Sequence, residues 1–119
     1  MANPNLASAS TITGKISGAV LTTSSADLLT NSAASGKLFR LNALYVANVD
    51  GTNSATATVT WYNADNTTSY NLAKVMTVPA AATLDLISKS IYLEEGDKIA
   101  GLASANASLH LIMSYEELS

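Results

Sequence analysis

The 119-residue chain is poor in charge: only 13% of its residues are charged, its net charge is −3, and 48% of its residues are hydrophobic. Its six basic residues are scattered rather than clustered, which excludes the phosphate-collecting patch of a nucleic-acid-binding protein. No run approaches the roughly 20 apolar residues of a membrane span, and the absence of cysteine excludes disulfides, thiolate metal sites and a cysteine nucleophile. Ordinary soluble domains are about 25% charged. We therefore expect other subunits to cover much of the exterior, the alternative being a monomer with a Ser/Thr-rich β surface.

The N-terminal residues MANPNLASAS lack both the basic start and the apolar centre of a secretion signal. They also lack charge and periodicity. We interpret residues 1–10 as a short flexible arm and residues 11–119 as a single domain.

The first part of this domain has the alternation of β-strands. Residues 10–16 and 18–22 predict two short strands. Residues 24–33 are compatible with a strand or with one helical turn capped by Ser or Asp.

A longer strand is predicted over residues 37–50. Its expected core face consists of Phe39, Leu41, Ala43, Tyr45, Ala47 and Val49. The opposite face combines Arg40, Asn42 and Asn48 with the apolar residues Leu44 and Val46. Because that second face is half apolar, we expect another subunit to cover part of it.

The strand ends at Asp50-Gly51, a strong turn signal. Residues 55–62 then alternate small or apolar residues with threonine, as a half-buried strand does. In the next predicted strand, residues 70–79, Lys74 interrupts the apolar face.

Four further strands are predicted over residues 82–88, 90–93, 97–104 and 108–118. Eight or nine short strands separated by turn residues indicate an all-β protein, a single antiparallel β-sandwich of jelly-roll type. A closed barrel stays open as an alternative.

The acidic stretch SIYLEEGDKIAG, residues 90–101, has two interpretations. Catalysis by paired carboxylates needs a second acidic group across a cleft, with one of them desolvated. No such partner lies near this stretch in the sequence, and Gly96 suits a tight reversal. We interpret the stretch as a hairpin turn whose carboxylates face water.

Other candidate chemistry is sparse. His110 is the single histidine, which is too little for a zinc site or an oriented catalytic triad. Among the aromatic residues, Tyr62 on the threonine face is the best exposed candidate for glycan binding. The SGK sequence at residues 35–37 lacks the first glycine and the helix of a phosphate-binding loop. We expect no cofactor, no metal and no catalytic residues.

Three segments carry a resemblance: MANPN at the start, SGKLFRLNALYVANVDGTN in the middle, and VPAAATLDLISKSIYLEEGDKI followed by SYEELS. They resemble the small β-sandwich virion proteins of tailed bacteriophages, particularly those of marine phages and cyanophages. The resemblance runs along nearly the whole chain. It rests on the amino-acid sequence of these segments and on the strand order, and not on a catalytic motif.

The resemblance implies a non-enzymatic structural protein of the phage particle, made in the host cytoplasm and located in the virion. The expected role is capsid decoration or cement, with the major capsid protein or other virion subunits as partners and the 1–10 arm ordering on the particle. Two alternatives remain: a small neck, tail or fibre component, and a freestanding β-sandwich module that binds glycan or protein.

We also expect a homo-oligomer, since closed symmetry is the usual outcome for identical subunits. For a sandwich of this size we expect a trimer. The candidate subunit-contact residues are Leu44, Val46, His110 and Ile112.

Overall fold

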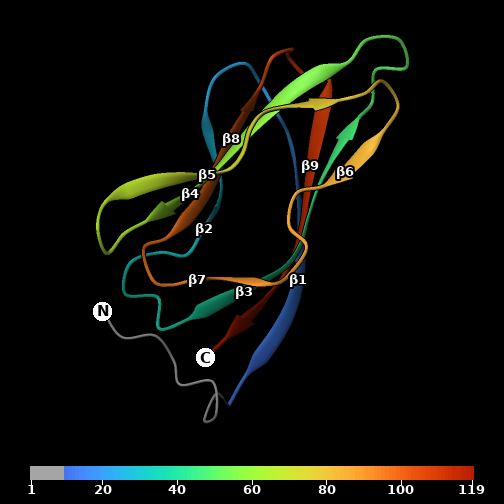
Figure 1. The fold of residues 1–119 in the computed structure, drawn as a ribbon. Coiled ribbons are helices and arrows are strands. Elements are labelled where there is room, and N and C mark those ends of the chain that lie inside the picture. Colours follow the sequence, from blue (N-terminus) through green and yellow to red (C-terminus); the bar gives the residue numbers. More distant parts are fainter. Residues whose placement is uncertain (1–9) are drawn as a thin grey trace.

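The computed structural model describes residues 10–119. In this range it contains nine β-strands and no helix, so the prediction of an all-β antiparallel sandwich is confirmed (Figure 1). The strands are β1 (Ile12–Val20), β2 (Ala26–Thr30), β3 (Leu38–Asn48), β4 (Ala55–Asn63), β5 (Thr68–Val78), β6 (Thr83–Asp85), β7 (Ile91–Leu93), β8 (Lys98–Ala103) and β9 (Leu109–Leu118). No helix long and apolar enough to cross a membrane occurs in the described range.

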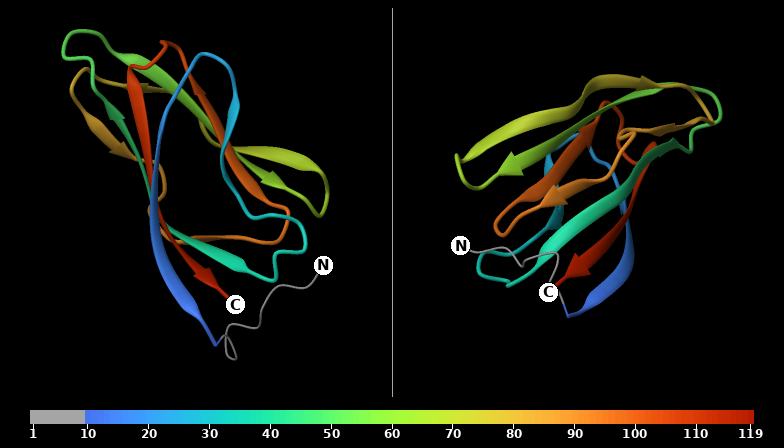
Figure 2. Two further views of the ribbon diagram at one scale, coloured as in Figure 1. Left: turned by 180° about the vertical axis from the view of Figure 1, so that it is seen from behind. Right: turned by 60° about the horizontal axis from the view of Figure 1, so that its bottom comes forward.

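The strands form two antiparallel sheets (Figure 2). The β9 sheet has the order β1-β9-β3-β6, and β7 pairs with another part of β3. The β4 sheet has the order β2-β8-β4-β5. β6 and β7 therefore act together as one interrupted strand at the edge beyond β3.

The core lies between the inner faces of the two sheets. β9 contributes Leu109, Leu111 and Met113, and β4 contributes Ala57 and Val59; all five side chains are fully buried. These are the inward positions that the alternation predicts. Each large apolar side chain buried in this way stabilises the fold by about 1.5–3 kcal/mol. The strict alternation also places the odd and even positions of β9 on opposite faces of the sheet.

Near the start of the domain one strand differs from the prediction, and the alternative left open for the next segment is decided. Residues 12–20 form the single strand β1, with an unbroken register against β9, instead of two short strands. The 24–33 segment contains strand β2 and no helical turn. The predicted 1–10 arm lies outside the described residues apart from Ser10, whose backbone amide donates to the Ser119 carbonyl oxygen at 2.8 Å.

The predicted faces of β3 are wrong in its second half. Leu41 pairs with Tyr115 and Ala43 with Ser114, so Asn42 is an extra residue without a counterpart on β9. Such a β-bulge shifts the alternation by one residue. The buried positions change from odd to even numbers, and Leu44 and Val46 are fully buried members of the core.

The correction matters for function, because Leu44 and Val46 were expected to contact another subunit. Side chains buried in the core cannot do so. The bulge instead turns Tyr45 outward, where 40% of its surface is exposed. Similar register shifts in β5 place Ala73 inward and Lys74 outward, which removes the interruption that Lys74 presented in the sequence.

Candidate subunit-contact surface

The outward side of the β9 sheet gathers exposed apolar side chains. We call it the outer face, and it is formed by Ile12, Gly14, Ile16, Gly18 and Val20 of β1, His110, Ile112, Ser114 and Glu116 of β9, and Tyr45 and Ala47 of β3. The structure exposes eight large hydrophobic side chains in the described range, and six of them lie on this sheet or at its ends: Ile12, Ile16, Val20, Tyr45, Val49 and Tyr92. An apolar concentration on one face is typical of an interaction site.

Residues of the three long strands lie in rows across this face. Ile112 is between Gly18 and Tyr45, and His110 is between Val20 and Ala47. The structure therefore brings two of the four predicted contact residues together on the outer face, both of them partly exposed. Their contact with another subunit stays a prediction.

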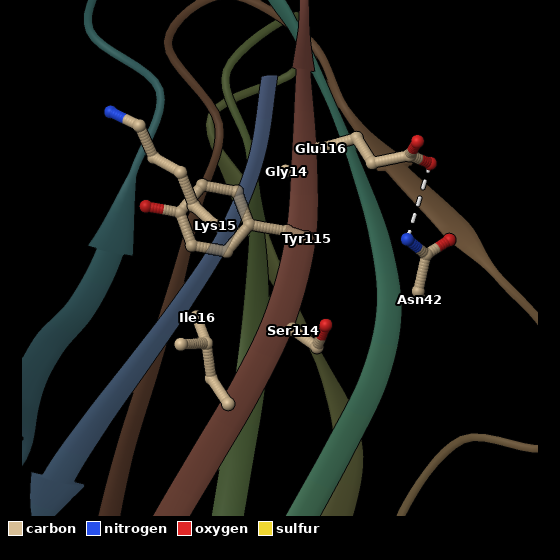
Figure 3. A pocket seen from close by; sticks show the side chains of 7 residues that line it. All are labelled: Gly14, Lys15, Ile16, Asn42, Ser114, Tyr115 and Glu116. Atoms are coloured by element: carbon tan, nitrogen blue, oxygen red, sulfur yellow. Dashed lines mark hydrogen bonds between the residues drawn. The ribbon is translucent and has the colours of Figure 1, made fainter. Parts of the chain in front are cut away.

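The outer face is not flat, because glycine alternates with large apolar residues along β1. Above Gly14 lies an open hollow of about 420 Å³, whose lining includes Ile16, Ser114 and Tyr115 (Figure 3). A second hollow of about 250 Å³ lies over Gly18, next to Val20 and Ile112. A Cβ atom added at Gly14 would have no neighbouring heavy atom within 4 Å. Both hollows are open to solvent and lie where glycine takes the place of a larger residue on β1.

The sequence prediction missed the contribution of β1 to this face. The prediction placed Gly14 in one short strand and Gly18 at the start of another, whereas both lie within the single strand β1. A signal was present: Ile12, Ile16 and Val20 recur every four residues with glycine midway between them. In a strand, positions separated by an even number of residues share a face.

One end of the outer face is polar. Glu116 lies 3.8 Å from Arg40 and accepts a hydrogen bond from the side-chain amide of Asn42 at 3.2 Å (Figure 3). The next residue, Glu117, points to the other side of β9, toward Lys15 and Lys37. The two neighbouring carboxylates are therefore on opposite faces and do not form an acid pair.

Glu117 is held between two lysines at the end of the sandwich. Its carboxylate oxygens lie 3.1 Å from the Lys15 ammonium and 2.9 Å from that of Lys37, and 12% of its side chain is exposed. Burial of the carboxyl group opposes ionisation, but the hydrogen bonds and charges of the lysines outweigh burial and hold the pKa of Glu117 below its ordinary value. The cluster joins β1, β9 and the start of β3.

We predict that Glu117→Gln lowers the free energy of unfolding by about 1 kcal/mol near pH 7, since both lysines are almost half exposed and the pair is screened by water. A lowered folded-state pKa stabilises the fold above the unfolded pKa of about 4.3 and loses that effect as the pH falls through the folded pKa. The free energies of unfolding of the natural chain and of Glu117→Gln, measured with urea, should thus differ near pH 7 and become equal near pH 3.

Glu116→Gln is the matched control, because the Arg40 pair is longer and lies on the open face. This variant should lower the free energy of unfolding by less than about 0.5 kcal/mol. A loss for Glu117→Gln that is the same at both pH values would show that its effect is not ionic.

The acidic 94–97 stretch forms a turn between β7 and β8, but the predicted hairpin is wrong, because β7 pairs with β3 in one sheet and β8 pairs with β2 and β4 in the other. The expected exposure of its carboxylates is also wrong for two of them. Asp97 is 1% exposed and Glu95 is 6% exposed. Glu95 accepts a hydrogen bond from the Gly36 amide at 3.0 Å, and Asp97 accepts from the Trp61 indole and the Ala64 amide. Each of these two carboxylates therefore links the turn to a distant segment of the chain through hydrogen bonds.

The aromatic side chains give little support to a glycan site. The Lys98 ammonium lies over one face of the Tyr62 ring, 5.1 Å from its centroid, and would compete with a sugar for that face. Trp61 stacks on Tyr70 at 5.4 Å. In residues 10–119 no group of three or more His, Cys, Asp or Glu side chains could hold a metal ion.

The sequence matches no protein-family model and no curated protein sequence. Among solved structures, a protein of Bacillus endospore appendages, described as disulfide-linked pili, is similar with a TM-score of 0.49 and 15% identity, over 91% of this chain and 87% of that one. Two crystal structures of a pentameric capsid protein from metagenomic phage sequences each give a TM-score of 0.41, with 16% and 14% identity. They are matched over 87% of this chain, which spans 60% and 61% of theirs.

Proposed function

We propose that the chain is a non-enzymatic structural protein of a phage virion, a decoration or cement subunit that binds the capsid lattice. The observation that carries this proposal is the outer face. It combines exposed apolar side chains with glycine hollows, and the Arg40–Glu116 ion pair lies at one end of it. Such a surface is suited to close contact with another protein and offers no converging polar groups for a reaction.

The ion pairs and hydrogen bonds made by the acidic side chains support a structural role. Glu117 binds two lysines, Glu116 binds Asn42, and the Asp97 carboxylate joins its own turn to the end of β4. Each of these carboxylates is bound by a lysine or by hydrogen-bond donors, as in a structural role, whereas acid–base catalysis by a carboxyl pair uses two carboxyl groups that face one another across a cleft.

The strand order supports the jelly-roll assignment within this proposal. When β6 and β7 count as one strand, the chain has eight strands in two sheets of four, 1-9-3-6/7 and 2-8-4-5. Two Greek keys folded together give such a double-sheet jelly roll, an architecture of viral capsid and lectin domains. The resemblance of the sequence to phage virion proteins favours the first of these.

The mechanism is mechanical. A decoration subunit bridges neighbouring capsid subunits and resists the internal pressure of a genome-filled head. Its binding free energy is distributed over many weak contacts that symmetry repeats across the lattice. Low charge favours this, because few charged groups must lose water when the outer face is covered.

The test is the number of copies in purified particles of the phage that encodes the chain, measured by quantitative peptide mass spectrometry against the major capsid protein. Hundreds of copies per particle are expected for cement. About a dozen copies would instead assign the chain to the neck or tail, which are built with low-order rotational symmetry. Absence from particles would overturn both virion roles and leave the third alternative, a freestanding β-sandwich module that binds glycan or protein.

Two variants make this measurement specific to the outer face. Ile112→Glu places a charge at the centre of the face and should lower the copy number at least tenfold. Val75→Glu alters a similarly apolar side chain that is 61% exposed on the β4 sheet, and should leave the copy number unchanged. Equal copy numbers for both variants would contradict binding through the outer face.

A further inference from the structure

The four sheet edges of the described chain differ in how well they could pair with another strand. β5 has two register shifts, β2 is five residues long with one shift, and β6 and β7 have three residues each. Bulges and short strands are the devices that protect edges from pairing with other chains. β1 has neither: it is nine residues long and runs against β9 without a shift. It is the regular edge of this sandwich (Figures 1 and 2).

The hydrogen bonds around β1 show which of its backbone groups point outward. Thr11 and Ser119 exchange both backbone bonds at 3.0 Å, and the Leu21 amide donates to the Leu109 carbonyl at 2.9 Å. In an antiparallel pair, hydrogen-bonded positions alternate along the strand. The odd-numbered residues of β1 therefore bond to β9, while the amides and carbonyls of its even-numbered residues point to the open edge. These are Ile12, Gly14, Ile16, Gly18 and Val20, the residues of the outer face.

We propose that β1 pairs with β1 of a second copy of this chain, antiparallel, about a two-fold axis at Ile16. The pairing joins the two β9 sheets into one continuous sheet. Five even-numbered residues then face five even-numbered residues of the second copy, and about ten backbone hydrogen bonds form. The proposal stands independently of the virion role, and it gives two-fold symmetry in place of the trimer expected from size.

The side chains make this register self-complementary, as a two-fold interface requires. On the outer face Ile16 meets its own counterpart, Ile12 meets Val20, and Gly14 meets Gly18. On the other side Lys15 lies beside Ser17.

Shifting the register by one residue in each copy toward the N-terminus would bring the two Lys15 side chains opposite one another, and like charges in that position destabilise a sheet. Shifting the register toward the C-terminus avoids that repulsion but shortens the stretch over which the two β1 strands pair. The register centred on Ile16 is the one that uses all nine residues and avoids the repulsion.

Cysteine substitution tests the pairing directly, because the chain has no cysteine of its own. Hydrogen-bonded antiparallel partners have Cα atoms about 5.5 Å apart, which is within the range of a disulfide. Ile16→Cys should therefore form a disulfide-linked dimer upon mild oxidation, seen as a doubled mass on a non-reducing gel. Because cross-linking accumulates product, it also captures the weak dimer expected of a small interface.

Ile12→Cys is the matched control. Ile12 is also well exposed, at 61% against 74% for Ile16, but in the proposed register its two copies are roughly 27 Å apart. It should not cross-link with itself, whereas a mixture of Ile12→Cys and Val20→Cys should. Equal cross-linking of Ile12→Cys and Ile16→Cys, or none with Ile16→Cys, would overturn the proposal.

A charge-swap experiment provides an independent readout at the axis. Ile16→Lys and Ile16→Asp should each sediment as a monomer at concentrations at which the natural chain is dimeric, because each variant faces its own charge. An equimolar mixture should regain the dimer. Both variants keep the exposed position and all bonds to β9, so unchanged thermal unfolding is the check on folding. Dimers in the single variants, or no recovery in the mixture, would contradict pairing at Ile16.

Discussion

Replacing Asp97 with alanine is expected to lower the free energy of unfolding by about 3 kcal/mol, because three donors lose a charged acceptor in a buried place. The carboxylate accepts hydrogen bonds from the Trp61 indole at 3.2 Å, the Ala64 amide at 3.0 Å and the Glu94 amide at 3.1 Å. Alanine would leave these donors without their acceptor. Urea unfolding followed by tryptophan fluorescence measures the loss, since the single tryptophan is one of the donors.

The size of the effect follows from the loops that meet at Asp97. Its backbone carbonyl also accepts from the Asn31 amide, and the Asn31 side chain donates to the Lys37 and Leu93 carbonyls at 2.9 Å. The ends of three strands are therefore connected through one turn. Removing the carboxylate weakens contacts between segments that are more than 30 residues apart, and such losses are difficult to compensate locally.

Asp27→Ala is the control for this prediction. Its carboxylate is exposed and pairs with Lys98 at 3.3 Å, so its removal should cost less than about 1 kcal/mol. Asp97→Asn, which keeps one acceptor oxygen, should fall between the two. If Asp97→Ala were as stable as Asp27→Ala, the three hydrogen bonds would not be what holds the turn.

Much of the fold could be predicted from the sequence where alternation is unbroken. β4 and β9 alternate cleanly, and their inward residues are those expected. The turn at Asp50-Gly51 is also confirmed: the Asp50 carboxylate accepts from the Thr52 and Asn53 amides, and these bonds lower its pKa. In each case neighbouring residues determine the local structure.

The exposure of the 94–97 turn could not be predicted in the same way. Its sequence is that of a solvated reversal, and the reversal forms. The partners that bury Asp97 and Glu95, however, come from Trp61, Ala64 and Gly36, each far away along the chain. Burial of a polar residue depends on how strands pair across the sandwich, and no local pattern encodes those contacts.

The candidate site was predicted in part for a related reason. His110 and Ile112 lie in the unbroken strand β9, and their outward position is as expected. Leu44 and Val46 follow the bulge at Asn42, where one additional residue reverses every later position. A polar residue between Leu41 and Ala43 is compatible with both regular alternation and a bulge, so the sequence alone does not select between them.

A pair of variants at adjacent positions of β3 tests this reversal. Val46→Glu should lower the free energy of unfolding by at least about 4 kcal/mol, because Val46 is fully buried and a carboxylate there has neither water nor a partner. A loss of this size approaches the total stability of many small domains. Circular dichroism and urea unfolding should therefore show a largely unfolded protein.

Tyr45→Glu is the matched control, because the same charge enters the neighbouring residue of the same strand on the opposite face. Tyr45 is 40% exposed, so the variant should remain folded and lose less than about 1 kcal/mol. Without the bulge the two outcomes would be exchanged, since Tyr45 would then face the core and Val46 the exterior. An unfolded Tyr45→Glu together with a stable Val46→Glu would thus restore the regular strand and return Val46 to the candidate contact residues.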